Sequence, residues 1–391
     1  MKWPANRLAS QINKNFGMFE VAHEMEKKGV SDIIHLEVGR PSYDTPVHIK
    51  EASKKALDDG IVHYGDLRGN TKLREALSKK LKDYNGIEVT PDEVLITNGL
   101  TQASFATFMA GLEEGDEVIV FEPYYPQHNK KIELVGAKVV TVPLDKAKEY
   151  RLDPDALVKA ITPKTRMIVF VNPANPVGRV FTHDEVSALA EIATKHDLLV
   201  LTDEVYEYVL YDDHKHLSLA SLPGMRDRTI STFAFTKAYA MDGWRLGYVA
   251  AKKEFVDAVY KVVLNETTHP NVFAQEGALA AVVSPQDCVA EMVKEDRRRR
   301  DLVHDRLNAM PKVKCNKPHA TIYTFPDFGG WGKSSEELAE ELLEETHVAT
   351  EAGTFYGASG EGHLRICFGS EPYERLEEAM DRIEGYLKKK A

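Results

Sequence analysis

The stretch TISTFAFTKAYAMDGWRLGYVAA, residues 229–251, contains two short apolar runs on either side of a polar loop that carries a lysine. The runs TISTF (229–233) and GYVAA (247–251) are rich in β-branched or small apolar residues, as buried strands are. Similar runs precede them at 94–96, 118–121, 139–142, 167–171 and 198–201, and from residue 118 onward amphipathic stretches separate them. This alternation is typical of parallel strands joined by crossover helices, so it predicts an α/β domain.

The segment HDEVSALAEIATKHD, residues 183–197, is predicted to be one of these helices. Thr182 can cap its first turn, and Glu185 follows three residues later to complete a capping box. After about residue 283 the sequence changes to long charged helical stretches and two short apolar runs, TIYTF (321–325) and HLRICF (363–368). This change predicts a second, smaller α+β domain.

Composition excludes several classes of protein. The chain has 391 residues and 61 acidic against 50 basic side chains, a net charge of −11, which argues against a nucleic-acid partner. It shows no apolar run near the roughly 18 residues of a membrane span, and its start, MKWPANRLASQINKNF, has no secretory pattern. Three widely spaced cysteines fit reduced thiols better than disulfides or a metal site. We therefore expect a cytoplasmic protein without a membrane, nucleic-acid or metal partner. The cysteines are Cys288, Cys315 and Cys367.

The basic run Arg297–Arg300 is the exception to this acidic balance. It lies in KEDRRRRDLVHDRL, residues 294–307, with acidic residues on both sides and apolar residues at helical spacing. This pattern predicts a solvated helix face and not a nucleic-acid surface.

Polar and aromatic residues follow four of the expected strands, at the edge where parallel sheets bind ligands. These residues include a lysine, an aspartate, a tyrosine, an asparagine and aromatic rings. Pyridoxal phosphate needs such a set: an amine for its aldehyde, a carboxylate for its pyridine nitrogen, donors to its ring oxygen and a stacking face. The four strings are EPYYPQH (122–128), NPANPVGRVF (172–181), TDEVYEYVLYD (202–212) and AFTKAYAMDGWRLGY (234–248).

The segment LITNGLTQASFATF, residues 95–108, is a candidate phosphate site. A strand is expected to end just before Asn98, and a helix to open at about Thr101. Gly99 would let the backbone amides approach an anion at the helix N-terminus.

Six strings in this order resemble the class I and II aminotransferases of pyridoxal-phosphate fold type I, over nearly the whole chain. The resemblance implies a large domain at 46–283 with a mostly parallel seven-stranded sheet flanked by helices. It also implies a small α+β domain at 284–391, which the segment 1–45 joins. The strings are LEVGRPSYDTP (36–46), HYGDLRGNTKLREAL (63–77), NPANPVG (172–178), TDEVYE (202–207), FTKAYAMDGWRLGY (235–248) and HLRICFG (363–369).

The resemblance assigns the catalytic roles position by position. Lys237 matches the lysine that holds the cofactor as a Schiff base and moves the substrate proton. Asp203 matches the carboxylate that pairs with the pyridine nitrogen, although a helix cap would explain an aspartate there equally well. Tyr206 and Asn175 match the two groups that hydrogen-bond the ring oxygen.

The remaining contacts follow from the same resemblance. Tyr125, preferred to Tyr124, matches the aromatic residue that stacks on the cofactor ring. Tyr64 matches a tyrosine that reaches the phosphate from the partner subunit, which implies a homodimer with a shared active site. Arg365 matches the arginine that clamps the substrate α-carboxylate, with the backbone of Gly39 and the side chain of Asn175 facing the same group. The expected phosphate site comprises Gly99, Leu100, Thr101, Thr236 and Arg245.

Several positions depart from the family's usual residues. Ala234 stands where a phosphate-binding serine is common, and Ala352 replaces a proline before Gly353. Thr101 stands where aspartate-using relatives often have a lysine for the distal carboxylate, which makes direct recognition of aspartate doubtful. Arg40 is a candidate for supplying that missing cation.

The predicted reaction moves an amino group from an L-amino acid to a 2-oxo acid, with 2-oxoglutarate as the expected acceptor, by a two-step ping-pong mechanism. Tyr64, Tyr125 and the segment Asn15–Phe19 are expected to line the side-chain pocket, which favours neutral or aromatic donors. One alternative is a β-lyase or an enzyme similar to aminocyclopropane-carboxylate synthase, with the same fold and cofactor. A remote alternative is a cofactor-binding regulatory protein.

Overall fold

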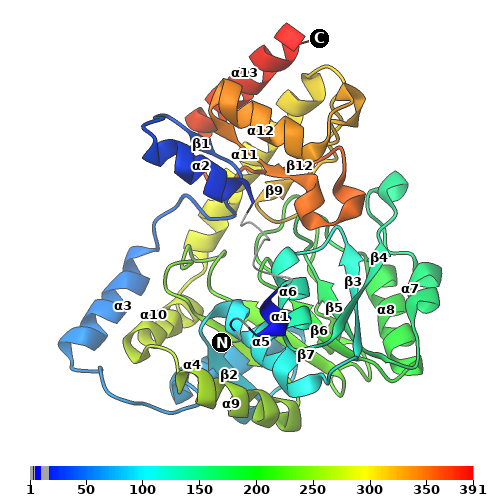
Figure 1. Ribbon diagram of the computed structural model, residues 1–391. Coiled ribbons are helices and arrows are strands. Elements are labelled where there is room, and N and C mark those ends of the chain that lie inside the picture. Colours follow the sequence, from blue (N-terminus) through cyan, green and yellow to red (C-terminus); the bar gives the residue numbers. More distant parts are fainter. Residues whose placement is uncertain (1–2, 4, 10–16, 391) are drawn as a thin grey trace.

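A seven-stranded sheet forms the centre of the larger part of the molecule (Figure 1). The computed structural model describes residues 3, 5–9 and 17–390. The strand order of the sheet is β2-β8-β7-β6-β5-β3-β4, and of the strands described only β8 is antiparallel to the others. The mostly parallel sheet expected from the sequence is therefore confirmed, while the GYVAA run returns antiparallel. The strands are β2 (Val94–Thr97), β3 (Glu117–Glu122), β4 (Lys138–Pro143), β5 (Thr165–Val171), β6 (Leu199–Asp203), β7 (Thr229–Ala234) and β8 (Gly247–Ala250).

Helices flank this sheet, as the alternating pattern predicts (Figure 1). Thr182 and Glu185 form the expected capping box at the start of α8. The helix expected to open at about Thr101 begins earlier, at Gly99, so the amides of Gly99 and Leu100 belong to its first turn. The helices of this part are α3 (Val47–Asp58), α4 (Thr71–Lys80), α5 (Gly99–Gly111), α6 (Pro126–Leu134), α7 (Pro154–Ala160), α8 (His183–Lys195), α9 (Lys253–Thr267) and α10 (Val272–Val283).

The smaller part, at the top of Figure 1, combines a segment near the start of the chain, from residue 18, with the C-terminal elements. Helix α1 (Asn6–Ala9) lies instead against α6 of the larger part. Strand β1 (Ile34–His35) pairs in parallel with β10 (Val348–Ala349), and β11-β12-β9 form a second small sheet. One hydrophobic core joins Met18 and Leu36 to Leu342, Ile366 and Ile383. The three-part domain division remains a prediction; this shared core favours it for the segment from Met18 to Leu36, but not for α1. The other elements here are α2 (Met18–Lys27), α11 (Asp287–Ala309), β9 (Tyr323–Thr324), α12 (Ser335–Thr346), β11 (Glu351–Ala352), β12 (Leu364–Cys367) and α13 (Tyr373–Lys390).

The basic run in α11 is only half solvated, which corrects the sequence interpretation. Arg297 and Arg298 are exposed, but the Arg299 and Arg300 side chains are 6% and 1% exposed. Arg300 donates to Asp212 and to the carbonyl of Pro318, and its guanidinium lies 4.8 Å from the centre of the Tyr211 ring. Helical spacing alone could not show that these arginines bind other parts of the chain.

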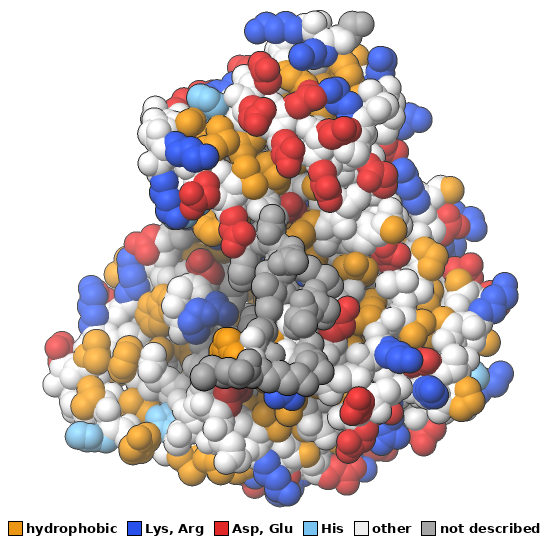
Figure 2. Space-filling view, in the orientation of Figure 1, with side chains coloured by type: hydrophobic (Ala, Val, Ile, Leu, Met, Phe, Trp, Pro, Cys, Tyr) orange, Lys and Arg blue, Asp and Glu red, His pale blue; other side chains and the backbone are white. Residues whose placement is uncertain are grey.

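The surface in Figure 2 carries acidic side chains in abundance over the small part, where α12 contributes six glutamates. Among the described residues, no helix is long and apolar enough to cross a membrane.

Candidate active site

A cavity of about 600 Å³ lies beyond the carboxyl ends of the parallel strands and is lined by residues of both parts of the molecule. Its volume suits a cofactor together with a small substrate. Residues that follow β3, β5, β6 and β7 meet there, as expected of strands that point the same way. Its lining includes the predicted residues Gly39, Leu100, Thr101, Tyr125, Asn175, Asp203, Tyr206, Thr236, Lys237, Arg245 and Arg365.

Two predicted residues lie outside this lining, for different reasons. Gly99 lies against the guanidinium of Arg245, which does line the cavity. A Cβ atom at Gly99 would come within 2.8 Å of the arginine Nη2. Tyr64 is 86% exposed, and its ring contacts His269 on the surface. In the part of the chain that the structure describes, Tyr124 is also absent from the lining, whereas Tyr125 is present.

Lys237 follows strand β7, and its amino group points across the cavity to the small part. Its Nζ donates a hydrogen bond to the carbonyl oxygen of Gly39 and lies 5.9 Å from the centre of the Tyr206 ring. Any side chain at position 39 would clash, because a Cβ atom there would lie 1.9 Å from the hydroxyl oxygen of Tyr323. The lysine is therefore held at the junction of both parts.

Asp203 ends strand β6 and is buried, with 3% of its surface exposed. Its Oδ2 lies 3.0 Å from Nε2 of His128, and its Oδ1 accepts a bond from the amide of Val205. Burial lowers the pKa of His128, so the neutral ring can donate from Nε2 to the carboxylate. Asp203 thus accepts a hydrogen bond from a nearby backbone amide, as a helix cap would, and its side chain also lines the cavity.

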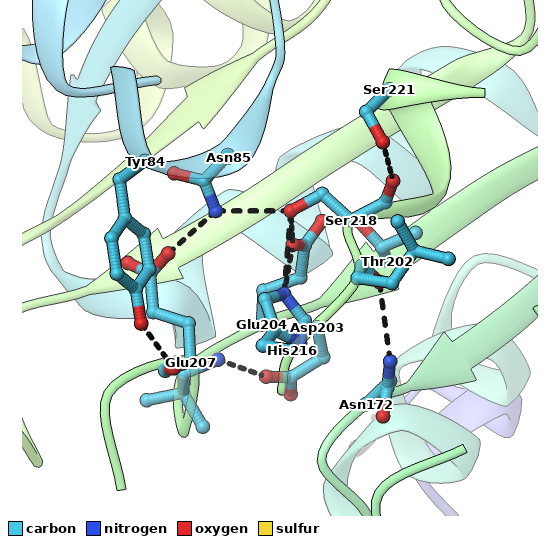
Figure 3. A network of polar contacts seen from close by, with 12 residues as sticks. Tyr84, Asn85, Asn172, Thr202, Asp203, Glu204, Glu207, His216, Ser218 and Ser221 are labelled. Carbon is cyan, nitrogen blue, oxygen red and sulfur yellow. Dashed lines mark hydrogen bonds and ion pairs between the residues drawn. The ribbon is translucent and has the colours of Figure 1, made fainter. Parts of the chain in front are cut away.

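The acidic residues beside Asp203 and Tyr206 enter a separate buried network (Figure 3). Glu204 accepts bonds from His216 at 2.7 Å and from Thr202 at 2.7 Å, while Glu207 accepts from Asn85 at 2.7 Å. Burial alone would raise the pKa of Glu204, but these hydrogen bonds hold it below the ordinary value. In TDEVYE, Asp203 and Tyr206 therefore line the cavity, while Glu204 and Glu207 anchor the segment behind it.

Arg365 of β12 lies between two aromatic rings in the wall of the cavity. Its guanidinium carbon is 4.4 Å from the centre of the Tyr323 ring and 4.9 Å from that of Tyr356. One Nη donates to the carbonyl of Glu37, and the other lies 3.5 Å from Oδ1 of Asn175. Among the described residues its buried Nε has no hydrogen-bond partner. A planar, oriented guanidinium with spare donors is suited to binding a carboxylate.

Sequence reasoning missed four lining or supporting residues of this site. His128 stands in the quoted string EPYYPQH but was not chosen, and Tyr323 hydrogen-bonds the Tyr206 hydroxyl at 2.9 Å. Lys131 lies one turn after His128, and its amino group donates to Ser104 at 2.8 Å. Glu351 lines the cavity from β11. The i, i+3 spacing of His128 and Lys131 was the one available signal.

The described residues fit the pyridoxal phosphate that the sequence implies. The first turn of α5, the guanidinium of Arg245 and the hydroxyl of Thr236 supply donors for a phosphate. Gly99, with φ of +70°, leaves open the space that a side chain would fill. Lys131 adds a buried amine whose pKa burial lowers to about 8. An anionic group is therefore matched by several cationic or N–H donors.

Comparison with known proteins gives the same family. A family model for "Aminotransferase class I and II" matches residues 31–383. The chain is 42% identical to an aspartate aminotransferase of Pyrococcus abyssi, over 97% of this chain and 96% of that protein. It is 41% identical to aromatic-amino-acid aminotransferase 2 of Thermococcus litoralis, with the same coverage. A crystal structure of an aromatic aminotransferase from Pyrococcus horikoshii matches with a TM-score of 0.90 and 41% identity, over 95% of this chain and 99% of that one.

The chain therefore belongs to the class I and II aminotransferases. It is a transaminase of fold type I, and its cofactor is pyridoxal phosphate. The β-lyase and regulatory alternatives are not favoured by these relatives.

Replacing Gly99 by alanine tests the phosphate site. The positive φ and the contact with Arg245 should both oppose a side chain, at a cost of about 1–3 kcal/mol. We expect the dissociation constant of pyridoxal phosphate, measured by fluorescence titration of the apoenzyme, to rise about tenfold or more. Gly243→Ala is the matched control, because nothing in the described chain lies within 4 Å of its added Cβ. Equal affinities for the two variants would contradict this assignment.

Proposed function

We propose that this transaminase takes the amino group of aromatic L-amino acids and gives it to 2-oxoglutarate in a two-step ping-pong reaction. The observation that carries the choice of donor is the aromatic wall of the cavity around Arg365. Thr101, which has no charge, stands where a distal carboxylate would need a cation. The aromatic lining residues are Phe19, Tyr125, Tyr206, Tyr323, Phe355 and Tyr356.

Part of the expected side-chain pocket agrees with this assignment. Phe19, at the start of α2, lines the cavity, whereas residues 15 and 16 lie outside the described residues. Arg40 is exposed and, in the described structure, absent from the lining, so it does not support a distal cation site. The relatives include proteins named for aspartate and for aromatic amino acids, and the wall of rings favours the second group.

The proposed roles of the residues follow from their positions. When bound, pyridoxal phosphate supplies an aldehyde for the amine and a ring that accepts electron density from the α-carbon. Lys237 would bind the cofactor and move the proton at the substrate α-carbon, since it lines the cavity and its amino group reaches across to Gly39. Asp203, fixed by His128, would accept a hydrogen bond from the protonated ring nitrogen, and Tyr206 and Asn175 would donate to the ring oxygen. Arg365 orients the α-carboxylate between its two flanking rings.

A donor panel tests the proposed substrates. The holoenzyme is mixed with phenylalanine, tyrosine, aspartate or alanine, with and without 2-oxoglutarate, and glutamate formation is measured. We expect kcat/KM for the aromatic donors to exceed that for alanine at least tenfold, because the rings of the wall desolvate the side chain. Pyruvate or ammonia released without an acceptor, or no turnover with aromatic donors, would contradict the proposal.

We also propose that the protein is a homodimer in the cytoplasm. Tyr64 is 86% exposed, and Leu57, Ile61 and Val62, which precede it in the chain, are 47%, 40% and 54% exposed, which leaves apolar surface for a second copy. All three cysteines are free thiols, as is usual in a reducing compartment. Tyr64 would then complete the phosphate site of the partner subunit.

Subunit mixing tests the shared site. Lys237→Ala and Tyr64→Ala proteins are unfolded together, refolded, and assayed for transamination. A hybrid dimer would have one site with both residues intact, so activity should recover to about a quarter of the wild-type value. Lys237→Ala mixed with Arg245→Ala is the control, because both residues line the cavity of one chain and no intact site can form. Equal recovery in the two mixtures, or none in either, would overturn the role of Tyr64.

A further inference from the structure

Glu351 is a buried carboxylate beside the substrate arginine that the reaction just described does not use. It is 4% exposed and lines the cavity. In the pairing of β11 with β12 it stands directly opposite Arg365, so both side chains leave the sheet on the same face. A short dicarboxylate held at one end by Arg365 can therefore bring its other end near Glu351.

Two backbone amides hold the Glu351 carboxylate. Met18, the first residue of α2, donates to its oxygens at 3.2 and 3.3 Å, and Ala352 donates to Oε1 at 3.1 Å. Gly17 allows this approach, because its φ is +75° and a Cβ atom there would lie 2.1 Å from Oε2. A proline at 352 could not make the second bond, since it lacks an N–H. Ala352 therefore supplies a hydrogen bond to the Glu351 carboxylate that a proline at this position would lack.

The surroundings of Glu351 make its charge adjustable. Burial raises the pKa of its carboxyl to about 7, against the opposing effects of Arg365 and of the two amides, while Glu37 acts in the same direction as burial. Tyr356 also faces it. The helices packed on β11 are α2, which presents the Met18 amide, and α12, whose buried face is Leu338, Ala339, Leu342 and Leu343 beside Ser335.

A ping-pong transaminase must accept an aromatic donor and a dicarboxylic acceptor in the same cavity. A permanent cation where the substrate side chain binds would attract the distal carboxylate of the acceptor. The same cation would lose its hydration when the aromatic ring of the donor covers it, which costs free energy. A carboxyl group that can gain a proton suits both, because two carboxylates in contact share one proton instead of both staying ionised.

We propose that Glu351 determines substrate specificity by sharing a proton with the distal carboxylate of dicarboxylic substrates, and by staying ionised on the Met18 amide when the side chain is aromatic. The proton comes from solvent as the dicarboxylate binds. This inference rests on the proposed pairing of aromatic donors with 2-oxoglutarate.

Ligand binding to the holoenzyme tests the inference without turnover. Maleate serves as the dicarboxylate and 3-phenylpropionate as the aromatic monocarboxylate, and calorimetry in two buffers counts the protons taken up with each. In the ratio of the two dissociation constants, the effect of any protein group whose ionisation changes the binding of both ligands equally cancels. In the wild type, binding of maleate should take up about one proton more than binding of 3-phenylpropionate at about pH 8. The affinity for maleate relative to that for 3-phenylpropionate should fall about tenfold per pH unit above about pH 7.

Three variants separate this role from a structural one. Glu351→Gln keeps a group that can donate to a carboxylate, so the ratio should no longer change with pH. Ala352→Pro fits the observed φ of −61° and removes one amide, which should raise the Glu351 pKa and move the fall in maleate affinity to higher pH. Glu361→Gln is the control, since Glu361 also accepts from a helix-start amide, that of Ser335, but is outside the cavity lining as described.

Each result decides the matter. A wild-type ratio independent of pH, or a Glu351→Gln protein with the wild-type pH dependence, would overturn the inference. If Glu351→Gln does not fold, an unshifted profile in Ala352→Pro would do the same. Failure of aromatic donors to react in the panel above would instead remove the proposed function, while the binding ratio would still report on Glu351.

Discussion

One short segment of backbone receives a hydrogen bond from each of the two parts of this molecule at the cavity. Lys237, from the loop after β7, donates to the carbonyl of Gly39, and Arg365, from β12, donates to the carbonyl of Glu37. The segment between them follows β1, which belongs to the small part. The residue proposed to bind the cofactor and the residue proposed to bind the substrate therefore meet on the same three residues, so the position of this segment sets the distance between them.

The central sheet was predictable because its strands are short, apolar and bounded by polar loops, and the family strings placed the lysine, aspartate and arginine on their correct elements. His128 was not predicted, since a histidine in a turn string carries no mark of the carboxylate it contacts across 75 residues. The burial of Arg299 and Arg300 was missed for the same reason, because their partners Ser42 and Asp212 are distant in sequence. Periodicity reports the face of a helix, but it does not report which other segment covers that face.

The departures from the family pattern gain meaning only in three dimensions. Ala352 alone reads as the loss of a proline, but in the fold its amide supports the carboxylate of the preceding residue. Gly17 likewise reads as a turn residue, yet it lets the first amide of α2 reach the same carboxylate. Ala352 and Gly17 thus both support one buried acid beside Arg365.

The most direct measurement is the site of covalent attachment of the cofactor. Holoenzyme reduced with borohydride and digested can be mapped by mass spectrometry, which locates the lysine that carries the pyridoxyl group. The cavity is also lined by a buried lysine, Lys131, whose pKa burial lowers to about 8, so a second amine competes for the aldehyde. The account predicts the label on Lys237 alone. A label on Lys131, or no labelled lysine in a protein that binds the cofactor, would contradict it.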